Sequence, residues 1–320
     1  MNNAVKLGGF GIGLAAVYTA ALGLGHASGP TRTPPAPAAA HGGHAASSSV
    51  APAAALPAGL QISQDGYRLT PISSELSTGA PQPFRFRIIG PDGAPVTKYT
   101  TNHDKDLHLI VVRRDLAGFQ HVHPQLENDG TWSIPLAVPA AGQYRVFADF
   151  QPAGHADGLT LGADVPASGD YRPRPLPAAE RSTTVDGYTV TLTGDLIPGG
   201  SSKLTLSVSK DGKPVTNLQP YLGAYGHLVA LRDGDLAYLH VHPDGEPGDG
   251  RTSPGPDVVF HTEVPAAGGY RLYLDFQHGG KVRTAEFTAV AGTPVPAAET
   301  PATSSAPSPS GHGADGHTHQ

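Results

Sequence analysis

The chain has 320 residues and a formal net charge of −6, and only 15% of its residues are charged. It has no cysteine and its single methionine is the initiator, so disulfides, thiolate zinc sites, cysteine nucleophiles, blue-copper ligation and thioether copper(I) sites are excluded. The acidic balance offers no basic stripe for nucleic acid. Histidine is abundant, with 16 copies, and neutral imidazole binds zinc, copper and nickel.

The N-terminus has the features of a targeting segment. Lys6 is followed by an uncharged, apolar, glycine-rich run over residues 7–25, and Gly25-His26-Ala27 could be a cleavage site. The run is also long enough to remain as a membrane anchor. We expect residues 1–27 to be a signal peptide or, as we favour, an anchoring apolar helix. The rest is then exported, either tethered on the extracellular face of the cell membrane or secreted after cleavage.

Three low-complexity stretches divide the remaining chain. Residues 28–59 are rich in Ala, Pro and Gly, and we expect a disordered linker because few apolar side chains are available for burial. Residues 166–181 form a Pro-rich joint. Residues 292–320 are a second low-complexity segment, in which His312, His317 and His319 either collect metal ions loosely or belong to a solvated, disordered tail.

Residues 60–165 and 182–291 are predicted to consist of short strands. Apolar and polar residues alternate over 84–88, 188–192 and 203–208, which is typical of half-buried strands. Asp-Gly turns punctuate both segments, and no long helical periodicity follows the N-terminal run. About seven or eight strands in roughly 107 residues favour an immunoglobulin-like sandwich. The predicted fold is all-β, with two tandem sandwiches.

The two segments are repeats of each other. Residues 108–113 match 227–232, 121–124 match 240–243, and 139–145 match 265–271. From 108 to 124 only 7 of 17 positions are identical, yet all three histidines are kept. The candidate metal ligands are therefore His108, His121 and His123 in the first repeat, and His227, His240 and His242 in the second.

The spacing of these histidines predicts a hairpin that gathers them. If Asp233-Gly234 is a two-residue loop, His227 faces His240 across the hairpin, and His242 points to the same side. The first repeat gives the same pairing of His108 with His121, with a poorer turn at Arg114-Asp115, where a slip of one residue would move His108 to the opposite face. We therefore regard the predicted hairpin register as more secure in the second repeat than in the first.

Three imidazoles suit Cu(II) or Zn(II) with one open position, and affinity order favours copper where it is available. Asp149 and Asp275, which match between the repeats, either orient an imidazole or lie in a turn. The alternative is that the triplets are structural, at a polar sheet face. His103, His155, His261 and His278 are interpreted as ordinary loop or surface histidines, and the aromatic residues Trp132, Tyr144, Tyr270 and Phe276 as core.

The exported sandwich repeats with His-Val-His-Pro elements resemble actinobacterial heavy-metal-binding, YtkA-like proteins, and more distantly the copper-carrying β-sandwiches of the CopC type. The resemblance covers roughly residues 60–290 and implies a copper- or zinc-binding role for the two histidine triplets. Copper carriers of that class often use an N-terminal histidine or Met-rich segments, and this chain has neither.

Three functions remain open from the sequence. The first is capture or delivery of copper or zinc by an exported protein. The second is a cell-surface immunoglobulin-like interaction module whose histidines are structural, with a membrane or cell-surface partner. The third is a metal-dependent hydrolase or oxidase, for which no phosphate loop, nucleophile elbow or metalloprotease helix is present.

Overall fold

Alternation of apolar and polar residues produces strands with one buried face along most of the folded chain. The computed structural model describes residues 56–239 and 241–292, and every regular element in them is a strand. In β3 (Gln82–Ile89), Phe84, Phe86 and Ile88 are buried and the arginines between them are half-buried. The predicted N-terminal apolar helix and the C-terminal tail lie outside the described residues.

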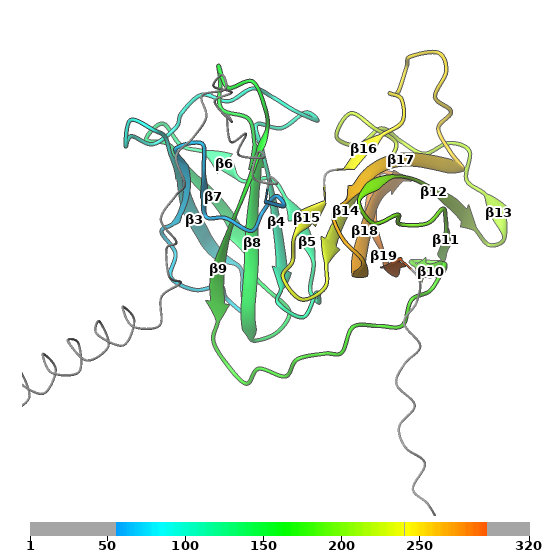
Figure 1. Ribbon diagram of the computed structural model, residues 1–320, viewed down its shortest axis with the longest axis horizontal. Helices are drawn as coiled ribbons and strands as arrows, with labels where there is room; N and C mark the ends of the chain where they lie inside the picture. The colour runs from blue at the N-terminus through cyan, green and yellow to red at the C-terminus, as the bar shows by residue number, and fades with distance from the viewer. Residues whose placement is uncertain (1–55, 240, 293–320) are drawn as a thin grey trace, which may run out of the picture. The chain divides into compact units, whose positions relative to one another are not determined.

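The first repeat is a sandwich of two antiparallel sheets, blue to green in Figure 1. One sheet has the order β1-β2-β3-β7-β6 and the other β5-β4-β8-β9. The remaining strands are β1 (Ser63–Gln64), β2 (Tyr67–Pro71), β4 (Leu107–Arg113), β5 (Gln120–Val122), β6 (Gln125–Leu126), β7 (Thr131–Leu136), β8 (Gly142–Phe150) and β9 (Leu159–Ala167).

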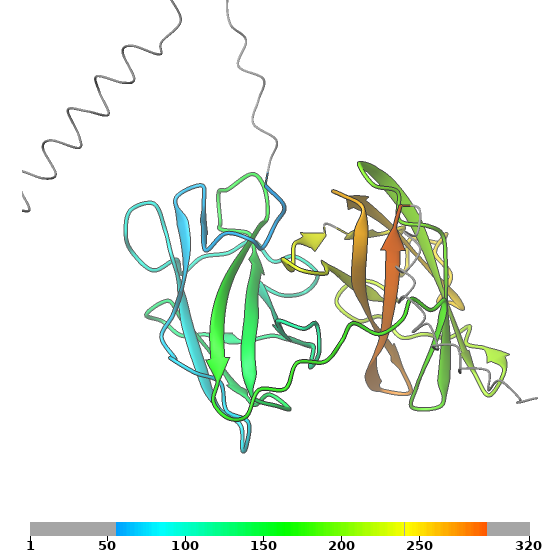
Figure 2. The ribbon, with the colours of Figure 1, turned by 60° about the horizontal axis from the view of Figure 1, so that its bottom comes forward.

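The second repeat builds the same topology again. Its sheets have the orders β10-β11-β12-β17-β16, with β13 paired to β12, and β15-β14-β18-β19. The strands are β10 (Ser182–Val185), β11 (Tyr188–Thr193), β12 (Gly200–Lys210), β13 (Lys213–Pro214), β14 (His227–Arg232), β15 (Tyr238–Leu239), β16 (Val241–Pro243), β17 (Asp257–Val264), β18 (Gly268–His278) and β19 (Lys281–Ala291). The long pairs β8–β9, in green, and β18–β19, in orange, are clear in Figure 2. The prediction of two immunoglobulin-like sandwiches is confirmed.

Each sandwich has its own apolar core. Trp132, Tyr144, Tyr270 and Phe276 are all buried, which confirms their interpretation as core residues. The hydroxyl of Tyr144 donates to the carbonyl of Ala140 at 2.8 Å, and Tyr270 donates to Ala266 at 2.7 Å. This bond back to the turn before the strand explains the repeated Pro-Ala-Ala-Gly-x-Tyr-Arg element and resembles the tyrosine corner of immunoglobulin-type sandwiches.

Strand β4 and its counterpart β14 carry a second buried face. Every residue of β4 is buried, which suits its run of consecutive apolar side chains, because a strand covered on both sides does not alternate. A third apolar cluster joins the repeats across this second face; its buried members are Ile110, Val112, Leu116, Phe147, Val229, Leu231, Leu236 and Tyr273. His108 and His227 precede these residues on the same faces of β4 and β14, so both point toward this shared region.

The hairpin register differs from the predicted one by two residues in both repeats. In the first, His121 pairs with Ile110 rather than with His108. In the second, Leu239 pairs with Ala230, whereas the predicted two-residue loop would place it opposite Leu228. A shift of two residues keeps every side chain on its face, so the one-residue slip that would have separated the histidines did not occur.

Longer loops cause this shift. The backbone N–H of Arg113 donates to the carbonyl of Ala117 at 2.9 Å, and Arg232 donates to Ala237 at 3.0 Å. A leucine in each loop, at positions 116 and 236, takes the left-handed conformation, with φ of 62°. Asp233-Gly234 is therefore part of a wider loop and not a two-residue turn, and the greater security assigned to the second repeat was wrong.

The second repeat also changes sheets within its histidine segment. After Leu239 the chain passes to β16, which pairs with β17 in the other sheet, and His242 is the partner of His261. His242 therefore does not continue the ladder beside His227 as predicted. His240, the predicted partner of His227, lies outside the described residues.

The end of the predicted disordered linker is also ordered. Ala58 forms a β-bridge with Tyr238, and the N–H of Gly59 donates to the carbonyl of Thr160 at 2.9 Å. Residues 56–59 are therefore held by backbone pairing to both repeats. This pairing satisfies backbone polar groups that would otherwise be buried without a hydrogen-bond partner.

Candidate metal centre

Three histidines of the first repeat converge where β4 meets β5. Nδ1 of His108 lies 3.0 Å from Nε2 of His121 and 3.2 Å from Nε2 of His123. One nitrogen from each residue lies within 4.8 Å of the other two. The sequence prediction that these three imidazoles share one patch therefore agrees with their placement.

The outer contacts of two of these rings determine which nitrogen carries a proton. Nε2 of His108 lies 3.1 Å from the carbonyl of Asn102, which only accepts, so Nε2 is the donor and Nδ1 keeps its lone pair. Nδ1 of His121 lies 2.8 Å from Oδ2 of Asp275, so Nδ1 donates and Nε2 keeps its lone pair. With both rings neutral, two lone pairs face each other at 3.0 Å.

Burial keeps the imidazoles of His108 and His123 neutral. Burial, together with the nearby His121, lowers the pKa of His108 to about 3 and that of His123 to about 4. The neutral form is the one that binds a metal ion, so these ligands are ready at neutral pH.

The second repeat supplies the carboxylate that orients His121. Asp275 lies in β18, opposite His227 in the ladder, and is buried. Its Oδ1 accepts a bond of 2.6 Å from the hydroxyl of Thr284, which leaves Oδ2 for His121. Of the two sequence alternatives for Asp275, orientation of an imidazole is the observed one, although the imidazole belongs to the other repeat.

Asp149 is the counterpart of Asp275 in β8 and is likewise in a strand rather than a turn. Its Oδ1 accepts from the hydroxyl of Thr160 at 3.4 Å, and burial raises its pKa to about 6. Among the described residues it has no hydrogen bond to an imidazole.

Two further histidines lie at the cluster. The ring of His227 is 5.7 Å from that of His108 and 5.6 Å from that of His121. The ring of His103 is 4.8 Å from that of His227, and His103 lies exposed in a turn, as predicted for a loop or surface histidine. The repeat comparison could not reveal His103, since leucine occupies the matching position 222; its one signal was its place in the turn just before the His108 strand.

The remaining candidates have other partners. His155 contacts the carbonyl of Asp157 at 2.8 Å, and His278 bonds the hydroxyl of Tyr188 at 2.7 Å. His261 is half exposed and lies 3.8 Å from Asp244. These three fit the ordinary role predicted for them.

A cavity of about 270 Å³ adjoins the cluster. Residues of both repeats line it, among them His103, His108, His121, His227 and His242. Asp149 also faces it. The cavity gives the cluster a route for an ion or a small molecule.

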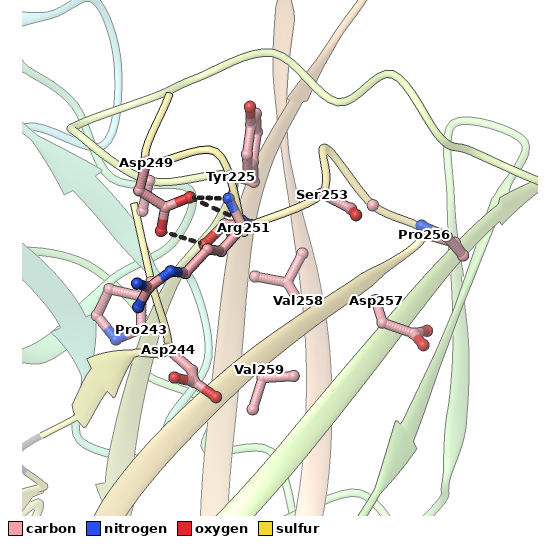
Figure 3. Close-up of a pocket in the computed structure, with 14 residues that line it drawn as sticks. Tyr225, Pro243, Asp244, Asp249, Arg251, Ser253, Pro256, Asp257, Val258 and Val259 are labelled. Carbon is pink, nitrogen blue, oxygen red and sulfur yellow. Dashed lines mark hydrogen bonds between the residues drawn. The ribbon is translucent and has the colours of Figure 1, made fainter. Parts of the chain in front are cut away.

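A separate cavity of about 610 Å³ lies beside β17 in the second repeat (Figure 3). Oδ1 of Asp249 accepts bonds of 2.7 Å from the backbone N–H groups of Arg251 and Thr252, and Oδ2 accepts one of 2.7 Å from the Thr252 hydroxyl. Figure 3 shows these bonds as dashed lines between residues of the loop. Both carboxylate oxygens of Asp249 therefore accept hydrogen bonds from the loop itself, and we assign this carboxylate a structural role.

Within residues 56–239 and 241–292 no helix has the length and apolar character needed to cross a membrane.

Comparisons with solved structures return proteins of low sequence identity. The Escherichia coli adhesin FdeC is 15% identical over 72% of this chain and 65% of its own, with a TM-score of 0.23. InvD of Yersinia pseudotuberculosis is 12% identical over 72% and 58%, with a TM-score of 0.23. Invasin, a bacterial integrin-binding protein, is 14% identical over 72% and 40%, with a TM-score of 0.19. The chain thus spans less than two thirds of the length of each.

No curated protein matches this chain. A family model described as a domain of unknown function, DUF8832, matches residues 62–167 and again residues 183–293. These two matches take in well over half of the chain and fall on the two sandwiches. The chain therefore belongs to the DUF8832 family and carries its domain twice.

Proposed function

We propose that this chain is an exported metal-binding protein that captures or delivers copper or zinc through His108, His121 and His123. One observation carries the proposal: Nδ1 of His108 and Nε2 of His121 face each other at 3.0 Å, while the other nitrogen of each ring faces an oxygen acceptor. In neutral rings with their protons on the acceptor side, both facing nitrogens present lone pairs. Two lone pairs at that distance repel unless a cation lies between them.

The spacing of the nitrogens fits a metal ion. In a tetrahedral site with metal–nitrogen bonds of roughly 2.0–2.1 Å, neighbouring nitrogens are about 3.3 Å apart. The two separations from Nδ1 of His108, 3.0 and 3.2 Å, need only a small expansion to match, and all three ligand atoms lie within 4.8 Å of one another. An all-imidazole site without sulfur suits Zn(II) or Cu(II), and the Asp275–His121 bond is the support that metal-binding histidines usually have.

Export and membrane tethering form part of the proposal and rest on the apolar run of residues 7–25. In an exported position the chain would meet metal ions before they reach the cell interior. The histidine-containing tail would add weak sites of its own.

Metal titration of the full chain tests this function. After treatment with a chelator, Zn(II) and Cu(II) binding is measured by calorimetry, and metal content by mass spectrometry. The triple variant His108→Ala, His121→Ala, His123→Ala should lose the tightest site. A matched triple variant, His155→Ala, His261→Ala, His278→Ala, should keep it. Equal affinity and stoichiometry in both variants would contradict the proposal.

A second candidate function is an interaction module at the cell surface, with structural histidines. It has one specific support: a proton on Nε2 of His121 would let an imidazolium bond both Asp275 and His108, without any metal. In that case the metal-free chain carries a charged His121 that NMR can detect, and titration shows no tight site. If a metal ion replaces that proton, binding releases a proton from the cluster.

One observation supports the third candidate function, a metal-dependent hydrolase or oxidase. Asp149 faces the cavity, and burial raises the pKa of its carboxyl group to about 6. A carboxyl group with that pKa can act as a general acid or base beside a metal ion. Hydrolysis of an activated ester by the metal-loaded chain, compared with its Asp149→Asn variant, tests this third candidate.

A further inference from the structure

His227 is a histidine of the second repeat that begins a strand facing the cluster. It is the first residue of β14 and pairs with Asp275, the residue that orients His121. Its ring lies 5.7 Å from that of His108, with 22° between the two planes, and 5.6 Å from that of His121. The rings within the triplet are 4.9–5.2 Å apart, so His227 is only slightly farther away.

The inner nitrogen of His227 has no partner. Its Nε2 is buried and makes no hydrogen bond among the described residues. In a neutral ring with its proton on Nδ1, this buried Nε2 presents a lone pair. A buried polar atom without a partner calls for an unseen water or ion.

We propose that His227 is a fourth ligand, so that one metal ion is bound by residues of both repeats. This inference rests on the proposed metal-binding function. The group of nitrogens within 4.8 Å comprises the three histidines of the first repeat, so binding would draw the imidazole of His227 toward them. The movement is a side-chain rotation, since the strand itself is held in the β14–β18 ladder.

A four-histidine centre has a consequence for how the repeats work. The ion would join β4 and β5 of the first repeat to β14 of the second, beside the apolar cluster that already joins them. Asp275 serves the same centre from the adjacent strand. The two histidine triplets then do not make two separate tight sites, and the chain binds one ion tightly.

The variant His227→Ala in the full chain tests the inference. Half an equivalent of Cu(II) is added so that only the tightest site fills, and pulsed EPR counts the coupled imidazole nitrogens. We expect four in the wild type and three in the variant. The affinity should fall by more than about tenfold, since a lost ligand costs at least as much as a lost supporting partner. His227→Gln, which keeps most of the volume, replaces His227→Ala if the latter does not fold.

A control separates ligation from packing. Tyr273→Phe removes a hydrogen bond between the repeats and no imidazole, so its nitrogen count should stay at four. If the wild type binds tightly and both His227 variants keep its affinity and nitrogen count, this inference is overturned while the proposed function stands. If the wild type shows no tight site, both fail.

Discussion

Nδ1 of His121, in the first repeat, donates a hydrogen bond of 2.8 Å to Oδ2 of Asp275, in the second. The side chains are buried, with exposures of 3% and 4%. A residue of one repeat thus decides which nitrogen of the other repeat's histidine faces the cluster. The carboxylate would also strengthen His121 as a ligand, because it raises the basicity of the imidazole.

Replacing Asp275 by asparagine should weaken metal binding about 10–100-fold, because the imidazole of His121 loses its charged partner. Calorimetric titration of the full chain measures the change. Asp149→Asn is the matched control: Asp149 holds the corresponding strand position and bonds Thr160 as Asp275 bonds Thr284. Equal weakening by both substitutions would show that the His121 contact is not the cause.

The metal-free chain should lose stability as the pH falls below about 6.5. The pKa values of His108, His123 and His227 are lowered to about 3, 4 and 2, chiefly by burial. Below the ordinary histidine pKa of about 6.5 the unfolded chain therefore binds more protons than the folded one, so this contribution is full above that pH and is lost as the pH falls. Asp149 has the opposite effect on stability. Its pKa is raised to about 6 in the folded chain, so below that pH the folded chain binds a proton more readily than the unfolded chain does.

The three histidines outnumber the one carboxyl group with a raised pKa, so the net effect of a lower pH should be a loss of stability. Urea denaturation at about pH 7.5 and about pH 5 measures this effect. The midpoint should fall at the lower pH, and the double variant His108→Gln, His123→Gln should reduce the difference. His155→Gln, in a loop of the first repeat, should leave it unchanged. A wild-type midpoint independent of pH over this range would refute the expectation.

Tyr273→Phe should destabilise the chain by about 1–3 kcal/mol, because it leaves a buried carbonyl without its donor. The Tyr273 hydroxyl donates to the carbonyl of Leu116 in the other repeat at 2.6 Å, and the ring stacks on Phe119 at 3.9 Å. Chemical denaturation gives the free energy of unfolding. Calorimetry should show the two repeats unfolding less cooperatively than in Tyr270→Phe, where the lost bond lies within one repeat.

Asp249→Ala should loosen the β16–β17 loop without affecting metal binding. The Thr252 hydroxyl and backbone N–H groups of the loop hold the pKa of Asp249 below its ordinary range, and the alanine variant loses all of these bonds. Limited proteolysis should cut this loop faster in the variant. A change in metal affinity would instead implicate the cavity of Figure 3 in the site.

Several features were predictable because they depend on local pattern and on internal comparison. The alternation in β3 and β11 requires one buried face, and the matching segments require the same sandwich twice. The histidines at 108, 121 and 123 were found because the second repeat also has histidine at the matching positions, whereas many neighbouring residues differ between the repeats. Even the two-residue error in register left them together, since side chains two apart share a face.

The sequence alone determined that the chain is a doubled β-sandwich with a histidine triplet at the same place in each copy. Only the tertiary structure decided that the copies are not equivalent. The chain has already changed sheets at His242 in the second repeat but changes only after His123 in the first, and His227 and Asp275 approach the triplet of the first repeat. The physical reason is that the apolar run of β4 requires cover on both faces but does not specify what covers it. The second repeat supplies that cover, and with it the carboxylate that orients His121.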